Sequence, residues 1–462
     1  MSSADTSAAT HLLVDDAMIA RKEGVVRRAH ACRKLSQPVI SGLESWQAPS
    51  GDERVYVYGT VLPSEDGGGL RMWYMRWPDR VIYAESENGV DWRRPELGLV
   101  KMADTAGNNA LPIRLHSPSV IDDPTDTDPA RRYKMLGVSR SPESRGYCVA
   151  YSADGLNWQY YPENPVLDGG DTCSFARDPA TGDYLAFHKR YGIHRGQRRR
   201  LVYLSTSPDM QRGWSDPELV MAPDEVDDAQ TEAEGGLFSQ FYHMSVIRYG
   251  GMWLGFVTHF RHTGLPVEKG PEQSKDDGPI NVQLVHSRDG RSWSRCEDRS
   301  PVIANGPHDY DAGCILGVGN GPIEADDEVR LYYTGITTTH GGYMPNKKIT
   351  VARAAWRLDG WVSLDATETP GTVETMPIRA DSQHLIVNAD AGRGELRAEV
   401  LDPSGVPVPG YHLSDCRPVA EDAVRQPVHW ETRSALPPGS ISIRFQFNNA
   451  SLYSFSSARK QR

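Results

Sequence analysis

Long apolar runs are missing from this sequence of 462 residues. No stretch approaches the ~18 consecutive apolar residues that a membrane-spanning helix needs, so we expect no membrane partner. Basic residues are in the minority, with 50 Lys and Arg against 61 Asp and Glu, and the net charge is −11. This acidic balance argues against nucleic acid as a partner.

Cysteine is sparse, because only six residues are scattered along the chain and none forms a Cys-x-x-Cys pair. The first residues, MSSADTSAATHLLVDD, lack the basic start and apolar core of a secretion signal. We therefore expect free thiols and a cytoplasmic protein. The sequence contains no tight zinc-type spacing, no Gly-rich phosphate loop and no G-x-S-x-G motif. No metal and no cofactor are expected, with chelation by His259 and His262 as a minor alternative.

A turn motif recurs along the first 370 residues. Ser-x-Asp/Asn-Gly is followed three residues later by Trp at Ser86–Gly89 with Trp92, Ser152–Gly155 with Trp158, and Ser287–Gly290 with Trp293. Two degenerate copies end at Trp214 and Trp361. Asn-Gly and Asp-Gly supply the positive φ angles of tight hairpins, and strand-like segments such as Arg71–Met75 precede each turn. Four strands in each repeat predict the blades of a β-propeller, whereas a series of sandwiches is the alternative.

The five predicted blades span roughly residues 50–100, 110–168, 169–222, 235–304 and 308–366. After about residue 370 the pattern becomes strict alternation, as in Ser440–Phe447 (SISIRFQF). The sequence therefore predicts an all-β protein, with a five-bladed β-propeller over residues 10–370 and a small C-terminal β-sandwich over residues 371–457. Residues 1–9 are expected to be disordered. The strand-like segment His11–Asp16 either closes the ring or ties it to the sandwich.

Polar residues gather where inner strands begin and second strands end, and these positions meet at one face of a propeller. The candidate catalytic groups are Asp171, Glu234 and Asp311, because opposed carboxylates suit glycosyl transfer. One protonates the leaving oxygen, while the other attacks the anomeric carbon or activates water. A turn cap is the alternative role for Asp171, and a solvated acidic loop is the alternative for Glu234.

Asp52 and Glu53 precede the first inner strand and are further candidates. The candidate substrate-binding residues are His116, Arg76, His188, Arg190, Gln240, Tyr242, His259, Arg261, Asp309 and His340.

Several blocks of the sequence resemble the five-bladed β-propeller glycoside hydrolases of families 32, 43 and 68. They include VYVYGTVLPSEDGGGLRMWYMRW, HSPSVIDDP, GDTCSFARDPATGDYLAFHKR and FSQFYHMSVIRYGG. The chain is most similar to family 32-like proteins whose C-terminal sandwich ends in a phrase like Asn449–Phe455 (NASLYSF). This resemblance implies a glycosidase that acts on a fructofuranosyl-type, arabinofuranosyl-type or related small glycoside.

The catalytic motifs of those families are altered in this chain. Val55–Gly59 stands where family 32 has Asn-Asp-Pro-Asn-Gly, and His116–Pro118 replaces Arg-Asp-Pro. Gln240 is the nearest counterpart of the Glu-Cys-Pro motif. Either the carboxylates come from other blades, or the chemistry has changed. The alternatives are a glycoside phosphorylase whose His188, Arg190, His259 and Arg261 hold phosphate, a sugar-binding propeller, and a biosynthetic enzyme that has lost hydrolysis. No pattern indicates the oligomeric state.

Overall fold

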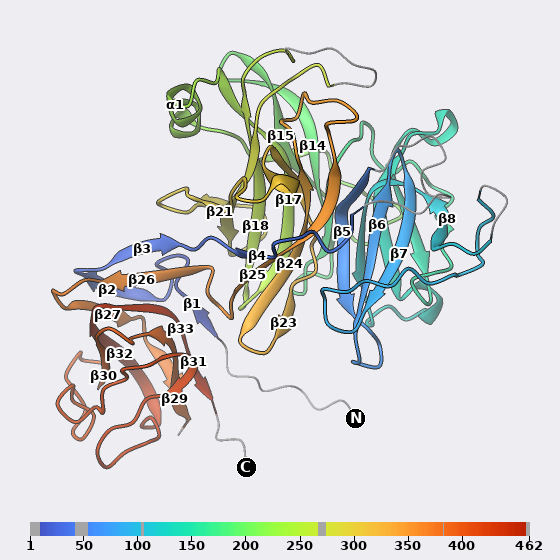
Figure 1. Ribbon diagram of the computed structural model, residues 1–462. Helices are drawn as coiled ribbons and strands as arrows, with labels where there is room; N and C mark the ends of the chain where they lie inside the picture. The colour runs from blue at the N-terminus through green and yellow to red at the C-terminus, as the bar shows by residue number, and fades with distance from the viewer. Residues whose placement is uncertain (1–9, 42–53, 103–105, 267–273, 382, 459–462) are drawn as a thin grey trace.

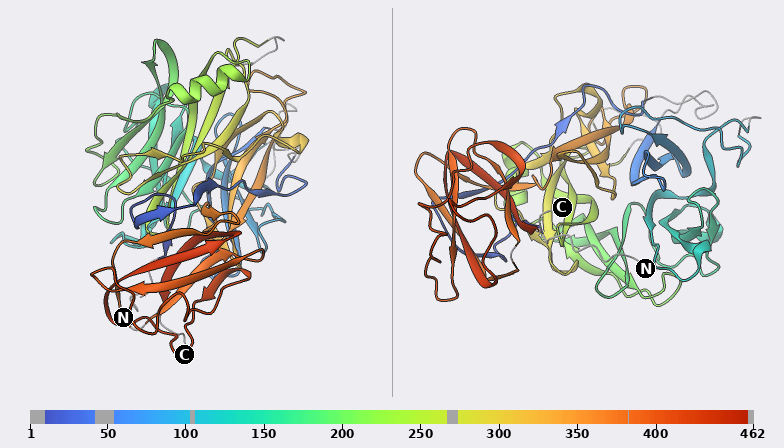
Figure 2. Two further views of the ribbon diagram at one scale, coloured as in Figure 1. Left: turned by 90° about the vertical axis from the view of Figure 1, so that its left-hand side faces the viewer. Right: turned by 90° about the horizontal axis from the view of Figure 1, so that it is seen from below.

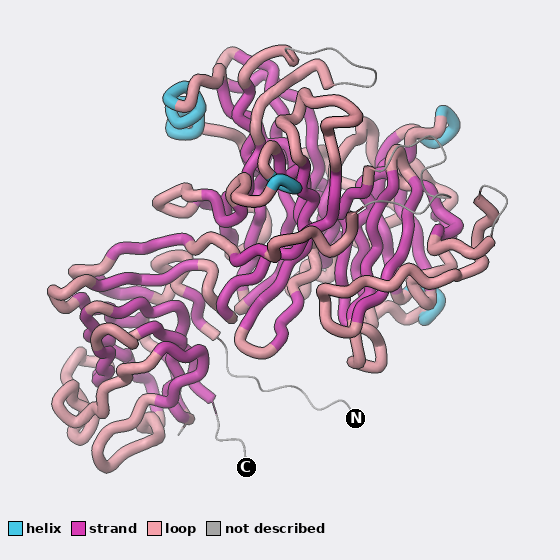
Figure 3. Tube along the Cα trace, viewed as in Figure 1, coloured by secondary structure: helices cyan, strands magenta, loops and turns pink. Residues whose placement is uncertain are grey.

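Strands dominate the computed structural model, which describes residues 10–41, 54–102, 106–266, 274–381 and 383–458 (Figures 1 and 3). The α-helix of these residues is α1 (Glu225–Ala233), and short 3-10 helices occur at Pro129–Arg131, Pro142–Ser144 and Asp309–Asp311. The expected all-β class is therefore confirmed. The disorder expected for residues 1–9 and the candidates Asp52 and Glu53 lie outside the described residues. No helix in the described ranges is long and apolar enough to cross a membrane.

Five antiparallel units follow one another within the described part of the chain, three as separate four-stranded sheets and two within one ten-stranded sheet. The first contains β5 (Val55–Pro63), β6 (Leu70–Arg76), β7 (Arg80–Ser86) and β8 (Ala110–Arg114). The second contains β9 (His116–Asp122), β10 (Tyr133–Ser139), β11 (Gly146–Ser152) and β12 (Gln159–Tyr160). The third contains β13 (Cys173–Arg177), β14 (Tyr184–His194), β15 (Gln197–Ser207) and β16 (Glu218–Met221).

The fourth and fifth units share one sheet because a single parallel bridge, Ile280 with Cys314, connects them. The fourth contains β17 (Phe238–Tyr249), β18 (Met252–His262), β19 (Ile280–Ser287), and the short outer strands β20 (Ser294–Arg295) and β21 (Pro301–Ile303). The fifth contains β22 (Cys314–Val318), β24 (Glu328–Ile336), β25 (Ile349–Arg357) and β4 (Arg33–Lys34), with β23 (Ile323–Ala325) paired to β24.

The first strands of the five units contact one another in cyclic order, β5 with β9, then β13, β17 and β22, and β22 returns to β5. Figure 2 shows the sheets grouped around this centre, with the C-terminal part to one side. The N-terminal segment supplies the outer strand of the last unit, where Lys34 pairs with Ala354 and Arg33 with Ala355. The ring is therefore closed by residues from opposite ends of this part of the chain.

The recurring turn takes the local structure that its residues predict. Gly89, Gly155 and Gly290 have φ angles of +74°, +76° and +73°. In the second copy, the Ser152 hydroxyl oxygen accepts a hydrogen bond from the Gly155 amide at 3.0 Å, and Asp154 accepts from two following amides. The Trp158 indole N–H then donates to the Gly155 carbonyl at 2.8 Å. The Trp thus stabilises the turn that precedes it.

Two sheets form the C-terminal part of the chain, and both include strands from far upstream. One has the order β3 (Val26–Ala29), β26 (Val362–Ala366), β33 (Ala450–Ala458), β29 (His384–Asp390) and β31 (Asp422–Pro427), with β1 (His11–Leu12) beside β33. The other has the order β2 (Ile19–Glu23), β27 (Gly371–Thr375), β32 (Gly439–Asn448) and β28 (Ile378–Ala380), with β30 (Glu395–Leu401) also on β32. The alternating residues Ile441, Ile443, Phe445 and Phe447 are buried between the sheets.

Strands from before residue 370 take part in the two C-terminal sheets. β1, β2, β3 and β26 all precede that residue, yet they pair within these sheets. His11 pairs with Phe455, so the start of the segment His11–Asp16 is tied to the C-terminal sheets. These pairings join residues more than 400 positions apart in the case of β1, and local sequence pattern carries no information about such partners.

Candidate functional site

Asp171 lies at the centre of a polar cluster built from the second, third and fourth units. It lies two residues before the start of β13, and its side chain is 28% exposed. Its carboxylate pairs with Lys189 of β14 and accepts a hydrogen bond from the Tyr242 hydroxyl of β17 at 3.4 Å. Two further basic groups face Oδ1, with His116 Nε2 at 3.3 Å and an Arg140 guanidinium nitrogen at 4.0 Å.

The position of Asp171 depends on the two preceding glycines, because the backbone there lies close to the second unit. Gly169 and Gly170 have φ angles of +86° and +136°, which are conformations that glycine tolerates. A Cβ at Gly170 would lie 2.6 Å from Val138 Cγ1, so a larger residue does not fit without displacement. The Gly-Gly pair thus brings Asp171 against the second unit, where His116 and Arg140 lie.

Aromatic rings surround the polar cluster. The Tyr58 ring centroid lies 5.8 Å from His116 and 5.6 Å from His243, and Trp77 lies 5.8 Å from His116. The Lys189 ammonium lies 4.0 Å from the centre of the Tyr242 ring. Aromatic faces beside charged hydrogen-bonding groups suit a sugar, which presents apolar C–H faces together with hydroxyl groups.

The electrostatics of the cluster keep Asp171 ionised. Burial alone would raise the pKa of Asp171, but the charges and hydrogen bonds of Lys189 and His116 outweigh it and hold the pKa well below its usual range. Burial lowers the pKa of Lys189, and the Asp171 charge opposes that effect. Burial raises the pKa of Tyr242 well above its ordinary value, so its hydroxyl remains a neutral donor. Burial also lowers the pKa of His243 to about 3.

Arg200 links a second carboxylate to this cluster. Its guanidinium pairs with Asp276 at 2.8 Å, donates to Gln240 Oε1 at 2.9 Å and lies 5.2 Å from the centre of the Tyr242 ring. His340 Nδ1 lies 3.0 Å from the Asp276 carbonyl oxygen, and its ring lies 5.1 Å from that of Tyr242. Asp276, with a side chain that is 33% exposed, therefore belongs to the surroundings of Tyr242.

The structure brings together five of the residues that the sequence selects. Asp171, His116 and Tyr242 are in one contact cluster, while Gln240 and His340 surround Tyr242 and Arg200. Asp311 is placed elsewhere: its side chain is 0% exposed, it pairs with Lys34 at 2.5 Å and it accepts a hydrogen bond from the Tyr333 hydroxyl at 2.8 Å. This environment favours a structural role for Asp311.

The remaining selected residues have other partners. Glu234 pairs with Arg261, and the Arg261 guanidinium also donates to Asn305. Arg190 pairs with the exposed Asp168. His188 is buried beside Tyr147 and Ser205, Asp309 is exposed at the start of a 3-10 helix, and Arg76 is half-buried at the end of β6.

The segment DEVDDAQTEAEGG, for which a solvated acidic loop is one expectation, forms helix α1 and its cap, and two of its carboxylates are buried. Asp224 caps the helix by accepting from the Val226 and Asp227 amides, and it pairs with Arg299 at 2.6 Å. Asp227 pairs with Arg295 at 2.7 Å. The segment is therefore a helix and not a loop, because Arg295 of β20 pairs with the buried Asp227 and Arg199 of β15 pairs with the buried Asp228. Glu234 itself is exposed at the C-cap of this helix.

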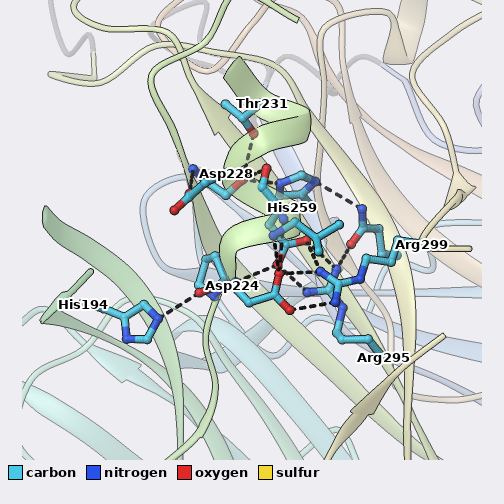
Figure 4. Close-up of polar contacts among 12 residues, drawn as sticks. His194, Asp224, Asp228, Thr231, His259, Arg295 and Arg299 are labelled. Atoms are coloured by element: carbon cyan, nitrogen blue, oxygen red, sulfur yellow. Dashed lines mark hydrogen bonds and ion pairs between the residues drawn. The ribbon is translucent and has the colours of Figure 1, made fainter. Parts of the chain in front are cut away.

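His259 belongs to the same network, which Figure 4 shows. Asp228 accepts from Arg199 at 2.5 Å and from the Ser239 amide at 2.9 Å. The Ser239 hydroxyl lies 2.7 Å from His259 Nε2, and Gln283 lies 3.3 Å from its Nδ1. Both ring nitrogens of His259 thus have protein partners, and the ring fixes α1 against the fourth unit.

Lys189, Arg200 and Asp276 are the functional candidates that sequence reasoning does not select. His188 and Arg190 attract notice because His and Arg recur near the ends of second strands. Successive side chains on a strand point to opposite faces, so Lys189 faces Asp171 while His188 faces Tyr147. The alternation of side chains along β14 distinguishes Lys189 from His188 and Arg190. Which of the two faces points toward Asp171 depends on how the adjacent unit packs.

Within the described ranges, no group of three or more His, Cys, Asp or Glu side chains has an arrangement that would hold a metal ion. No protein-family model and no curated protein matches the chain. Among solved structures, it is similar to an N-acetylgalactosamine deacetylase from F. plautii in complex with blood group B trisaccharide, at 12% identity and a TM-score of 0.46 over 73% of this chain and 97% of that one.

Two further solved structures are similar along nearly the whole chain. A GH32 β-fructofuranosidase from Bombyx mori has 11% identity and a TM-score of 0.41, covering 94% of each chain. An exo-β-1,3-galactanase from Phanerochaete chrysosporium has 10% identity and a TM-score of 0.38, covering 94% of this chain and 100% of that one. All three TM-scores are below 0.5.

Proposed function

We propose that the five units are the blades of a five-bladed β-propeller and that Asp171 is the catalytic carboxylate of a glycoside hydrolase-like enzyme. The substrate is a fructofuranosyl-type, arabinofuranosyl-type or related small glycoside. The observation that carries this proposal is an ionised carboxylate, held by Lys189 and His116, among aromatic rings. Such a carboxylate acts as a nucleophile at the anomeric carbon or as a base toward water.

We assign proton donation to the leaving oxygen to Asp276. It is partly exposed and reaches the surroundings of Tyr242 through Arg200. Glu234 and Asp311 are less suitable, because their contacts lie outside the surroundings of Tyr242. Glu234 pairs with Arg261, which also donates to Asn305, and Asp311 is fully buried against Lys34. A proton donor matters most when the leaving group is a poor one, because a good leaving group departs without protonation.

The experiment compares turnover of aryl furanosides and related aryl glycosides by the full chain and two variants. Asp171→Asn should lower kcat ~10³-fold on every substrate that the wild type cleaves. Asp276→Asn should slow the turnover of methyl glycosides strongly and the turnover of nitrophenyl glycosides only a little. Asp168→Asn is the matched control, because Asp168 is a nearby exposed carboxylate that pairs only with Arg190 among its charged neighbours in the described residues. Retained turnover in Asp171→Asn would refute the assignment.

A glycoside phosphorylase is the second candidate, and the basic groups around Asp171 favour it. Lys189, His116 and Arg140 face a single carboxylate, and phosphate would take the place of water as the group that attacks the anomeric carbon. These residues differ from the His188, Arg190, His259 and Arg261 set that the sequence suggests. Turnover that requires inorganic phosphate and releases a sugar phosphate would select this candidate over hydrolysis.

A further inference from the structure

A cavity of about 880 Å³ lies between the first and second units. Its walls include Asp79 in the β6–β7 turn, Arg80 at the start of β7, Arg114 of β8, and Arg140 after β10. The last of these residues also faces Asp171 Oδ1 at 4.0 Å. The cavity therefore adjoins the Asp171 cluster, although Asp171 itself does not line it.

Positive charge exceeds negative charge in this cavity. Three guanidinium groups line it, whereas Asp79 is the carboxylate among its described lining residues. Asp79 is already paired with Arg114 at 2.8 Å. This local excess contrasts with the net charge of −11 of the whole chain.

Arg80 is the cation with the least compensation. Within the described residues no carboxylate lies within 4 Å of its guanidinium, which donates one hydrogen bond, to the Leu111 carbonyl at 3.3 Å. Burial and the neighbouring Arg114 charge lower the pKa of Arg80. An anion in the cavity would relieve this repulsion and accept the remaining guanidinium hydrogens.

Hydroxyl groups complete the lining. Ser139 and Ser144 share a hydrogen bond of 2.7 Å at the β10–β11 turn, and Tyr160 donates to the Arg114 carbonyl at 2.9 Å. Guanidinium forks together with hydroxyl donors recognise tetrahedral phosphoryl oxygens well, because they satisfy several acceptor sites of a dianion at once.

We propose that this cavity binds the phosphoryl group of a small sugar phosphate. Arg80 and Arg114 would hold the phosphoryl oxygens, and Arg140 would connect the phosphoryl end of the ligand to the Asp171 cluster. The binding claim stands without any reaction at Asp171, and only the statement that the sugar phosphate is the substrate of Asp171 rests on the proposed function.

The test is calorimetric titration of the full chain with glucose 6-phosphate, inorganic phosphate and glucose at low salt. Arg80→Gln removes this cation without breaking an ion pair, so folding should be retained. We expect it to weaken phosphate-ligand affinity about tenfold or more. Arg291→Gln is the matched control, because Arg291 is exposed in the fourth unit and is absent from the lining of this cavity. Asp171→Asn should bind glucose 6-phosphate at least as tightly as the wild type does, while it loses turnover of the aryl glycosides.

Three outcomes separate the possibilities. Tighter binding of glucose 6-phosphate than of inorganic phosphate, lost in Arg80→Gln but kept in Arg291→Gln, supports a sugar phosphate site. Equal affinity for both ligands, with the same dependence on Arg80, overturns the sugar phosphate and leaves a free phosphate site. Absence of binding, or equal binding by wild type and Arg80→Gln, overturns the proposal even if Asp171 proves catalytic.

Discussion

His116 Nε2 lies 3.3 Å from Asp171 Oδ1, while its Nδ1 lies 3.0 Å from the Pro78 carbonyl oxygen. Both ring nitrogens of His116 therefore face oxygen atoms, one on the Asp171 carboxylate and one on the Pro78 carbonyl. This contact joins the start of β9 to the residue that precedes β13, and it sets the position of the carboxylate relative to the aromatic rings.

The first prediction concerns this positioning role. His116→Phe keeps an aromatic ring but removes both polar contacts, so we expect kcat to fall at least about tenfold with a smaller change in KM. His188→Phe is the control, because His188 is equally buried and contacts Tyr147 and Ser205 instead. Steady-state kinetics on the best aryl glycoside measure both effects. Equal losses of kcat in the two variants would point to a general packing effect.

The second prediction concerns ring closure by Lys34. Its ammonium forms a buried ion pair with Asp311, so Lys34→Met leaves an unpaired buried carboxylate. We expect the free energy of unfolding to fall by about 3–5 kcal/mol. The adjacent Arg33 pairs with Glu328 at the surface, and Arg33→Met should cost less than about 1 kcal/mol. Urea unfolding measures both, and similar losses for the two variants would contradict a special role for Lys34.

The third prediction concerns the turn motif. A Cβ at Gly155 would lie 2.6 Å from Trp73 Cζ2, in addition to the strain of a φ angle of +76°. We expect Gly155→Ala to destabilise the protein by about 2–4 kcal/mol. Gly196 has a φ angle of +74°, and a Cβ added there would meet no atom within 4 Å, so Gly196→Ala should cost only about 1–2 kcal/mol. Thermal unfolding compares the two, and an equal cost would mean that the Trp73 contact relaxes freely.

The fourth prediction concerns stability at mildly acidic pH. Burial lowers the pKa of His188 to about 3, of His243 to about 3 and of His259 to about 4. These rings stay neutral in the folded protein while the unfolded chain protonates them below its pKa of about 6.5. At these three histidines alone the unfolded state therefore binds about three more protons at pH 5, and stability should fall steadily from pH 7 to pH 5. Chemical denaturation at pH 7, 6 and 5 gives this slope, and an unchanged free energy of unfolding would contradict it.

Local features of this protein follow from its sequence, whereas long-range partners do not. The Gly155 turn and its Trp158 lie within seven residues of Ser152, so their geometry is visible in the residue pattern. Asp311 is different, since it is buried in an ion pair with Lys34, which lies 277 positions earlier in the chain. The face toward which Lys189 points depends on Tyr242 of the next unit, which strand alternation alone does not specify.

The central claim is that a glycoside binds with its anomeric carbon at Asp171, and a crystal structure of Asp171→Asn with an uncleaved aryl glycoside tests it most directly. If Asp171 is the nucleophile, the anomeric carbon should lie about 3–3.5 Å from the substituted side chain; if it is the base, one ordered water should lie between them. In either case the sugar should pack against the rings of Tyr58, Trp77 or Tyr242. A sugar bound on another face of the molecule, with the side chain at position 171 still held by Lys189 and out of reach, would contradict the account.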